Sequence, residues 1–386
     1  MRKIFQPNIL FIFIITIIIS SILNFGWITT WNSLRVPAML PPHFDLRFYQ
    51  YGALAIENDF NPLRTSHAIW LKHAILTGTE LSKYFIYQFK LSHFLKLYNE
   101  YYFLVFANTV IIIYLFCCYK IISINKKSYW ILILFLSSGP LLAIERTNND
   151  LIIFILLYCS AIYSNIIGMI LNLLAISIEF WPAVAAISFI KNKKKIFLFF
   201  IIILFFIYNY NNLVTLGEPE IGEGLSFGSK FFSYLLAPLQ LPFTKHYHVS
   251  FILIFLTFLM LIKKLRFFNL EFKKKPSEFE QRLFLIGSTI YCSLFVIASN
   301  YDYKFIFLIF SIPYLRQIKN KYQKNLILIS ILISSNLLWI ELLTNTKIST
   351  IFNSLFKCVV FVILLTLLIR FFIDFYKNNS LKKLFF

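Results

Sequence analysis

Long apolar runs alternate along the chain with short polar or lysine-rich segments. A helix that crosses the hydrocarbon core of a bilayer needs about 20 predominantly apolar residues. The pattern therefore predicts an all-α polytopic membrane protein with about 11 transmembrane helices. The expected spans are 8–27, 101–120, 128–144, 151–164, 166–178, 196–214, 247–263, 283–298, 305–315, 325–342 and 354–373.

Several of these runs are shorter than the usual minimum of about 17 residues. Short spans are tolerated where neighbouring helices bury their ends or where the bilayer thins. A half-helix is also expected over 182–190, after the Trp181-Pro182 break. This half-helix returns the chain to the side of the membrane on which the lysine-rich segment 191–195 must lie.

Charge is distributed unevenly between the polar segments. The chain carries 37 Lys and Arg against 17 Asp and Glu, a net charge of +20. Most of the basic residues fall in segments assigned to the cytoplasm, whereas only four acids do so: Glu271, Glu278, Glu280 and Asp374. An excess of Lys and Arg on the cytoplasmic side is typical of inserted membrane proteins. Both termini are therefore expected on the cytoplasmic side of a bacterial inner membrane. Nucleic acid is not expected as a partner, because the positive charge is explained by this topology.

Polar chemistry is then concentrated on the outer face of a single membrane domain spanning 1–386. The first outer segment, 28–100, contains mixed aromatic, leucine and lysine patterns at 44–57 and 81–98 that predict amphipathic helices at the interface. A second outer segment covers 215–246. The 5 cysteines lie inside apolar runs and lack partners at metal-ligand spacing, so neither a disulfide framework nor a metal is expected.

Asp45 is the first carboxylate in the outer segment and follows His43-Phe44 in an aromatic stretch that leads to the Asn61-Pro62 turn. We interpret Asp45 as the catalytic residue, with much of the remaining chain serving as its scaffold. The alternative is that Asp45 is a solvated carboxylate or the N-cap of a helix over 46–57.

The polar run Glu145–Asp150 joins two apolar spans through an unusually charged turn. Arg146 offers a planar donor fork suited to phosphate oxygens. Asn149 and Asp150 stand at the start of the next span, where helix N–H groups favour an anion or a cap. A solvated turn with Asp150 as a cap is the alternative.

Two further positions complete the set of candidate substrate-binding residues. In 299–304, Lys304 is suited to a phosphate and Tyr303 to stacking on a sugar ring, unless both only anchor the interface. Glu179 is an apparently buried carboxylate three residues before Pro182. Since an unpaired charge in the membrane is costly, Glu179 requires a partner, and Arg146 is the expected one, whether for function or for structure alone.

Taken together and in this order, these features resemble membrane glycosyltransferases of the GT-C type, especially glycosyltransferase family 87. The matching pieces are Asp45 in the first outer loop, the Arg146 to Asp150 turn opening an apolar helix, and a charged residue before Pro182. The resemblance covers most of 1–190, with a weaker echo at 300–304. Two departures stand out, because the family usually has Lys where Glu179 stands and often Arg where Lys304 stands.

The resemblance implies an inverting transfer of a hexose, mannose-like, from a polyprenyl-phosphate donor to a lipid or glycan acceptor on the outer face of the cell envelope. Asp45 would act as the general base, and Arg146 and Lys304 would stabilise the leaving phosphate. No cofactor besides the lipid-linked donor substrate is expected.

Three other functions are weighed against this one. A transporter or flippase of lipid-linked saccharides would place charge near the membrane midplane. A membrane O-acyltransferase would need a buried His, and no His lies within an apolar span. An O-antigen polymerase or ligase would share the lipid-linked substrates but would be expected to carry more arginines in its outer loops.

Overall fold

The computed structural model of the chain describes residues 6–59, 85–124, 129–163, 165–179, 181–189, 226–227, 271–297, 300–341 and 346–378. Within these ranges the protein is mostly helical. The described strands are two residues each, β1 (Ser226–Phe227) and β2 (Asn300–Tyr301), and they pair antiparallel with Ser226 opposite Tyr301. The expected spans 196–214 and 247–263, the Asn61-Pro62 turn and nearly all of 215–246 lie outside the described residues.

Three described helices contain stretches long and apolar enough to cross a membrane: α1 (Pro7–Phe25), α5 (Glu100–Ile124) and Leu355–Phe375 within α17 (Thr346–Asn378). At a rise of about 1.5 Å per residue, the 19 residues of α1 already extend about 28 Å. These helices match the predicted spans 8–27, 101–120 and 354–373 in position and indicate a membrane protein. The full count of about 11 spans is not established within the described part of the chain.

The first span is peripheral, since only 6% of its apolar stretch is buried inside the protein. It ends at Gly26, which adopts a φ of +82° that an L side chain rarely adopts. Helix α2 (Trp27–Ser33) follows at once and buries Trp31. The chain is thus redirected at Gly26 toward the segment that leads to Asp45.

The apolar stretch predicted as one helix over 128–144 is two short helices, α6 (Trp130–Phe135) and α7 (Ser138–Arg146). The backbone is extended at Ser137, and Pro140, which has no N–H to donate, lies in the first turn of α7. The start of α7 is buried, and distant groups accept its backbone N–H groups: Ser138 donates to Asn336 Oδ1 and Gly139 to the Ser335 carbonyl, both at 3.3 Å. The prediction of one continuous helix over 128–144 was therefore wrong.

Helices α8 (Asn149–Ile162) and α9 (Ile166–Ile178) match the predicted runs 151–164 and 166–178. Each begins at an asparagine cap, Asn148 and Asn165, whose side-chain oxygen accepts a backbone N–H two residues on. With 14 and 13 residues they extend only about 20 Å, short of the hydrocarbon thickness of about 30 Å.

The Trp181-Pro182 break opens a 3-10 helix, η3 (Trp181–Phe189), in the place of the expected half-helix. The expected span 305–315 is likewise a 3-10 helix, η7 (Asp302–Ser311), continued by α14 (Ile312–Leu315). Both pack against α13 (Glu278–Ile297), which corresponds to the predicted span 283–298. The predicted run 325–342 is divided between α15 (Lys321–Ser334) and α16 (Leu337–Ile340).

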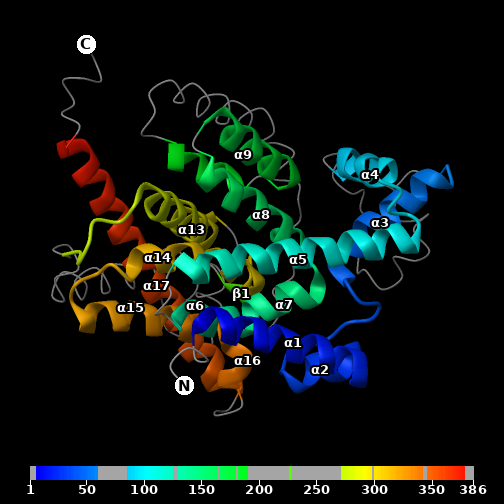
Figure 1. Cartoon of the computed structure of the whole chain (residues 1–386), viewed down its shortest axis with the longest axis horizontal. Coiled ribbons are helices and arrows are strands. Elements are labelled where there is room, and N and C mark those ends of the chain that lie inside the picture. The colour runs from blue at the N-terminus through cyan, green and yellow to red at the C-terminus, as the bar shows by residue number, and fades with distance from the viewer. Residues whose placement is uncertain are drawn as a thin grey trace, which may run out of the picture.

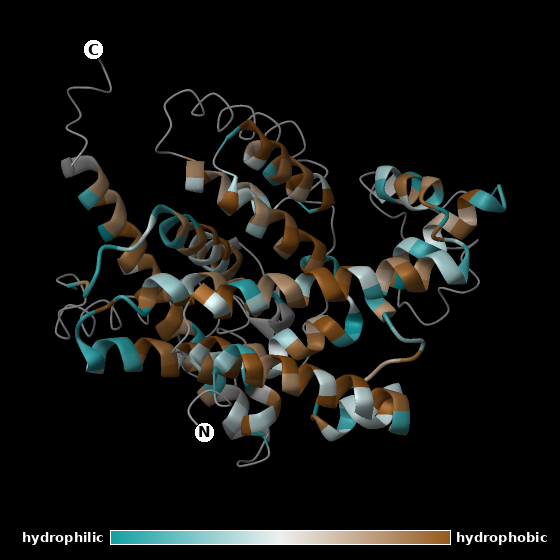
Figure 2. Cartoon of the chain, viewed as in Figure 1, coloured by the Kyte–Doolittle hydropathy of each residue, from teal (hydrophilic) through white to brown (hydrophobic). Residues whose placement is uncertain are grey.

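Aromatic side chains fill the core between these helices. Phe154 of α8 stacks on Phe310 of η7 with ring centroids 4.1 Å apart, and Phe295 of α13 stacks on Phe361 of α17 at 4.6 Å. The hydropathy colouring shows long brown stretches on α1, α5, α8 and α9, with teal residues gathered toward helix ends and connections (Figure 2). Stacked aromatic pairs of this kind stabilise the packing beyond the area that they bury.

Helices α3 (Phe44–Glu57) and α4 (Phe85–Phe94) lie together at one end of α5 (Figure 1). The helix predicted over 44–57 has those bounds, and the helix predicted within 81–98 is shorter than expected. The two helices approach closely where Gly52 faces the Phe89 ring. Arg47 then ties α3 to the start of α5 through two bonds of 2.8 and 2.9 Å to the Glu100 carboxylate.

Candidate functional site

Asp45 lies in the first turn of α3 and meets the turn between α7 and α8. The Asn148 side-chain amide donates to its Oδ2 at 2.7 Å, and Arg146 Nη1 lies 3.6 Å from its Oδ1. The Asp45 side chain is 23% exposed, so its carboxylate is oriented by these contacts and still reaches solvent. Asp45 and Arg146, both predicted as site residues, therefore lie against each other, and their place in one functional site remains a prediction.

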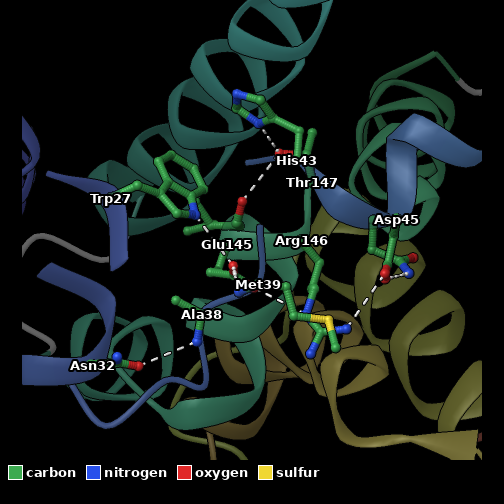
Figure 3. Close-up of polar contacts among 11 residues, drawn as sticks. Trp27, Asn32, Ala38, Met39, His43, Asp45, Glu145, Arg146 and Thr147 are labelled. Carbon is green, nitrogen blue, oxygen red and sulfur yellow. Dashed lines mark hydrogen bonds and ion pairs between the residues drawn. The ribbon is translucent and has the colours of Figure 1, made fainter. Parts of the chain in front are cut away.

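Arg146 is held from the opposite side by its neighbour Glu145. Arg146 Nε donates to Glu145 Oε2 at 3.0 Å, and the Phe44 ring lies 5.9 Å from the guanidinium carbon. Nη2 donates to no residue that the structure describes. The guanidinium therefore lies between two carboxylates, as Figure 3 shows, with one nitrogen still available to a ligand.

The turn between α7 and α8 contains a left-handed residue, Thr147. Thr147 has a φ of +47°, and its hydroxyl lies 2.7 Å from Nδ1 of the buried His43. Asn148 caps α8 with its oxygen and uses its amide nitrogen for Asp45. Because an asparagine side chain carries both an acceptor and donors, one residue starts the helix and orients the carboxylate.

Asn149 and Asp150 occupy different environments. The Asn149 amide donates to the Tyr49 hydroxyl of α3. Asp150 is fully buried, and neither of its carboxylate oxygens has a hydrogen bond from a described residue. The nearest cation is Lys304, whose Nζ lies 3.9 Å from Asp150 Oδ1.

Glu179 pairs with Lys304 and not with Arg146, so the partner expected from the sequence was wrong. Lys304 Nζ donates to Glu179 Oε2 at 3.0 Å, the Trp181 indole donates to the same oxygen, and Lys304 lies 4.6 Å from the Trp181 ring centroid. The reason is that η3 and η7 both pack against α13, with Trp181 of η3 in contact with Phe307 of η7, which brings Lys304 to Glu179, while Glu145 and Asp45 already bind Arg146. Tyr303 lies in η7, and its side chain is outside the described residues.

Burial and neighbouring charges shift the pKa values of three side chains in this region. Burial raises the pKa of Asp45 above its ordinary 3.8, the Asn148 hydrogen bond and the Arg146 charge oppose that rise, and Glu179 adds to it. Burial likewise raises the pKa of Glu145, and burial and Arg47 lower the pKa of His43 to about 4.

Three residues were missed by sequence reasoning. Glu145 and Asn148 stand within the polar run that marked Arg146, but the sequence does not show which members of a run turn inward. Lys357 is 2% exposed in the apolar part of α17, with its Nζ 5.6 Å from the Phe305 ring centroid. A charge within the predicted span 354–373 was the available signal for Lys357, because such residues are rare and usually functional.

No family model, no curated protein and no solved structure matches this chain. Within the described ranges, no three His, Cys, Asp or Glu residues gather closely enough to hold a metal ion. The site is therefore interpreted from its own geometry.

Proposed function

We propose that the protein is an integral membrane glycosyltransferase of the GT-C type. It would transfer a mannose-like hexose from a polyprenyl-phosphate donor to a lipid or glycan acceptor on the outer face of a bacterial inner membrane. The observation that carries this proposal is the part-exposed Asp45 carboxylate, bonded by Asn148 and flanked by Arg146. It combines a base and a cation in a chain with three helices suited to a membrane.

The base chemistry follows from the environment of Asp45. Its carboxylate would take the proton from the acceptor hydroxyl while that oxygen attacks the anomeric carbon. The bond from the anomeric carbon to the phosphate oxygen breaks as the new glycosidic bond forms, which inverts the configuration. A raised pKa makes Asp45 a stronger base than a solvated aspartate, and the Asn148 bond fixes its direction.

The departing polyprenyl phosphate carries negative charge that needs preorganised donors. Arg146 is suited to this task because Nη2 is not used by any described residue, while Nε and Nη1 are fixed by Glu145 and Asp45. Lys304 supplies the second cation. Glu179 stands where the family usually has Lys, and in this proposal it positions the Lys304 ammonium through their 3.0 Å bond.

The test is sugar transfer in membranes from a panel of radiolabelled polyprenyl-phosphate sugars, comparing the wild type with Asp45→Asn. The matched control is Asp59→Asn, which makes the same change at an exposed position two residues beyond α3. Loss of transfer in Asp45→Asn alone, with equal insertion of all three proteins, supports the proposal. Equal transfer by Asp45→Asn and the wild type would remove Asp45 from the mechanism.

Transport of a lipid-linked saccharide is the second candidate, and Lys357 is the observation that favours it. A lysine buried in an apolar helix, here near one end of Leu355–Phe375, is a feature of substrate or ion pathways in transporters. Flipping of a fluorescent lipid-linked saccharide in proteoliposomes separates the two functions. Flipping that requires Lys357 but not Asp45, with no sugar transfer, would favour transport over glycosyl transfer.

A further inference from the structure

The Glu145 side chain binds three groups: the Trp27 side chain of α2, the Met39 backbone N–H and the Arg146 side chain. Its side chain is fully buried and accepts three hydrogen bonds. Oε1 accepts the Met39 backbone N–H at 2.8 Å and the Trp27 indole N–H at 3.3 Å, whereas Oε2 accepts Arg146 Nε–H at 3.0 Å. Figure 3 shows this carboxylate between Trp27, Met39 and Arg146.

The two oxygens of this carboxylate bind different parts of the protein. Oε1 fixes the segment between α2 and α3, because Met39 lies six residues before Asp45 and Trp27 begins α2. Oε2 accepts from Nε of Arg146, while Nη1 on the other side of the guanidinium approaches Asp45. Glu145 therefore fixes the start of α3 and the direction of the guanidinium together.

We infer that Glu145 is a positioning residue for the transfer reaction, holding Arg146 and the segment before Asp45 in one fixed arrangement. This inference rests on the proposed function for its chemical meaning. It would explain why a buried carboxylate, costly unless fully hydrogen-bonded, is kept at this place. An apolar residue of similar size could fill the space but could bind neither Arg146 nor the Met39 N–H.

The Glu145→Gln variant separates the binding of Arg146 from the binding of Trp27 and Met39. The amide oxygen can still accept from Met39 and Trp27, but the amide NH₂ then meets the Arg146 Nε–H as donor against donor. We expect kcat to fall by about 100-fold with little change in the donor KM, since a small misplacement of Arg146 removes stabilisation that develops in the transition state. Glu57→Gln, which removes a half-exposed carboxylate from the end of α3, is the matched control and should keep the wild-type kcat.

Arg146→Lys completes a double-mutant cycle, since lysine has no Nε–H fork for Glu145 to hold. Adding Glu145→Gln to Arg146→Lys should then cause no further fall in kcat. The same four proteins are compared by thermal unfolding in detergent, where the effects of the two substitutions on Tm should also fail to add. A merely structural role would leave the two effects on kcat independent and would overturn the inference.

The two measurements also separate failure of the inference from failure of the proposed function. If the wild type transfers no sugar, the glycosyltransferase proposal fails, and the unfolding cycle alone decides whether Glu145 positions Arg146. Non-additive shifts in Tm would keep the positioning role for whatever reaction or binding the site performs. Additive shifts, or a Glu145→Gln variant with the kcat of Glu57→Gln, would overturn that role.

Discussion

Asn148 donates its side-chain amide to Asp45 over 2.7 Å, although 103 positions separate the two residues in the chain. The contact joins the first turn of α3 to the N-cap of α8. It brings the catalytic carboxylate expected in the first outer segment against the polar turn expected to bind phosphate.

Replacing Arg146 with Gln should shift the pH dependence of sugar transfer. In the proposed mechanism Asp45 is a base only when deprotonated, so the rate should fall as the pH falls through its pKa, which burial raises above 3.8. Because the Arg146 charge lowers that pKa, removing the charge moves the acid limb of the profile to higher pH. The measurement is the initial rate against pH for the wild type and Arg146→Gln.

Lys90→Gln, which removes a charge from the exposed side of α4, should leave the position of the acid limb unchanged. A limb that stays in place in Arg146→Gln, or that moves to lower pH, would show that Asp45 is not the group that titrates.

Replacing Lys304 with Met should destabilise the fold. The substitution leaves Asp150 fully buried and Glu179 partly buried without their shared cation. Removing one partner of a buried ion pair typically costs about 3 kcal/mol, because the remaining charge is uncompensated. Thermal unfolding in detergent should show a clearly lower Tm, with partial recovery when Glu179→Gln is added.

Lys319→Met is the matched control for this experiment. It breaks a pair with Glu271 that is shorter, at 2.7 Å, but well exposed on both sides. Solvent screens such a pair, so its loss should change Tm little. Equal shifts in the two variants would mean that burial of the Lys304 pair has no energetic consequence.

Replacing Arg47 with Met should loosen α3. Arg47 bonds the Pro42 carbonyl at 2.9 Å, the Gln50 side chain and both oxygens of Glu100. Since Glu100 is itself half-exposed, we expect a loss of about 1.5 kcal/mol for this set of charge-assisted bonds. Amide hydrogen exchange over 44–57 should accelerate by about tenfold.

The control is His93→Gln, which removes the more exposed pair with Glu57 at the other end of α3. Exchange over 44–57 should change less in this variant than in Arg47→Met. The opposite order would show that α3 is held from its C-terminal end.

Gly52→Ala should destabilise the contact between α3 and α4. Alanine is favoured over glycine inside a helix by about 1 kcal/mol, but a Cβ at Gly52 would lie 2.0 Å from Cδ1 of Phe89. Overpacking of a buried contact costs about 1–3 kcal/mol, so the steric effect should outweigh the helix propensity. Thermal unfolding should show a lower Tm, and Phe89→Leu should restore part of the loss in the double variant.

The amino-acid pattern alone determined the membrane class, the positions of α1, α5 and the apolar part of α17, and the helix over 44–57. These features depend on local composition and periodicity, which the sequence displays directly. The sequence also marked Asp45, Arg146, Asp150 and Lys304 as polar residues at the edges of apolar runs. Such residues need partners or water because a bare charge in hydrocarbon is costly.

Only the tertiary structure decided which of these residues meet. The Glu179–Lys304 pair depends on the packing of η3 and η7 against α13, and the Arg146 position depends on Glu145 at Nε and Asp45 at Nη1. The break at Leu136–Ser137 lies beside the bonds from Ser138 to Ser335 and Asn336, and the 3-10 helix over 302–311 packs against α13. Partner choice is a property of three-dimensional proximity, which no local pattern encodes.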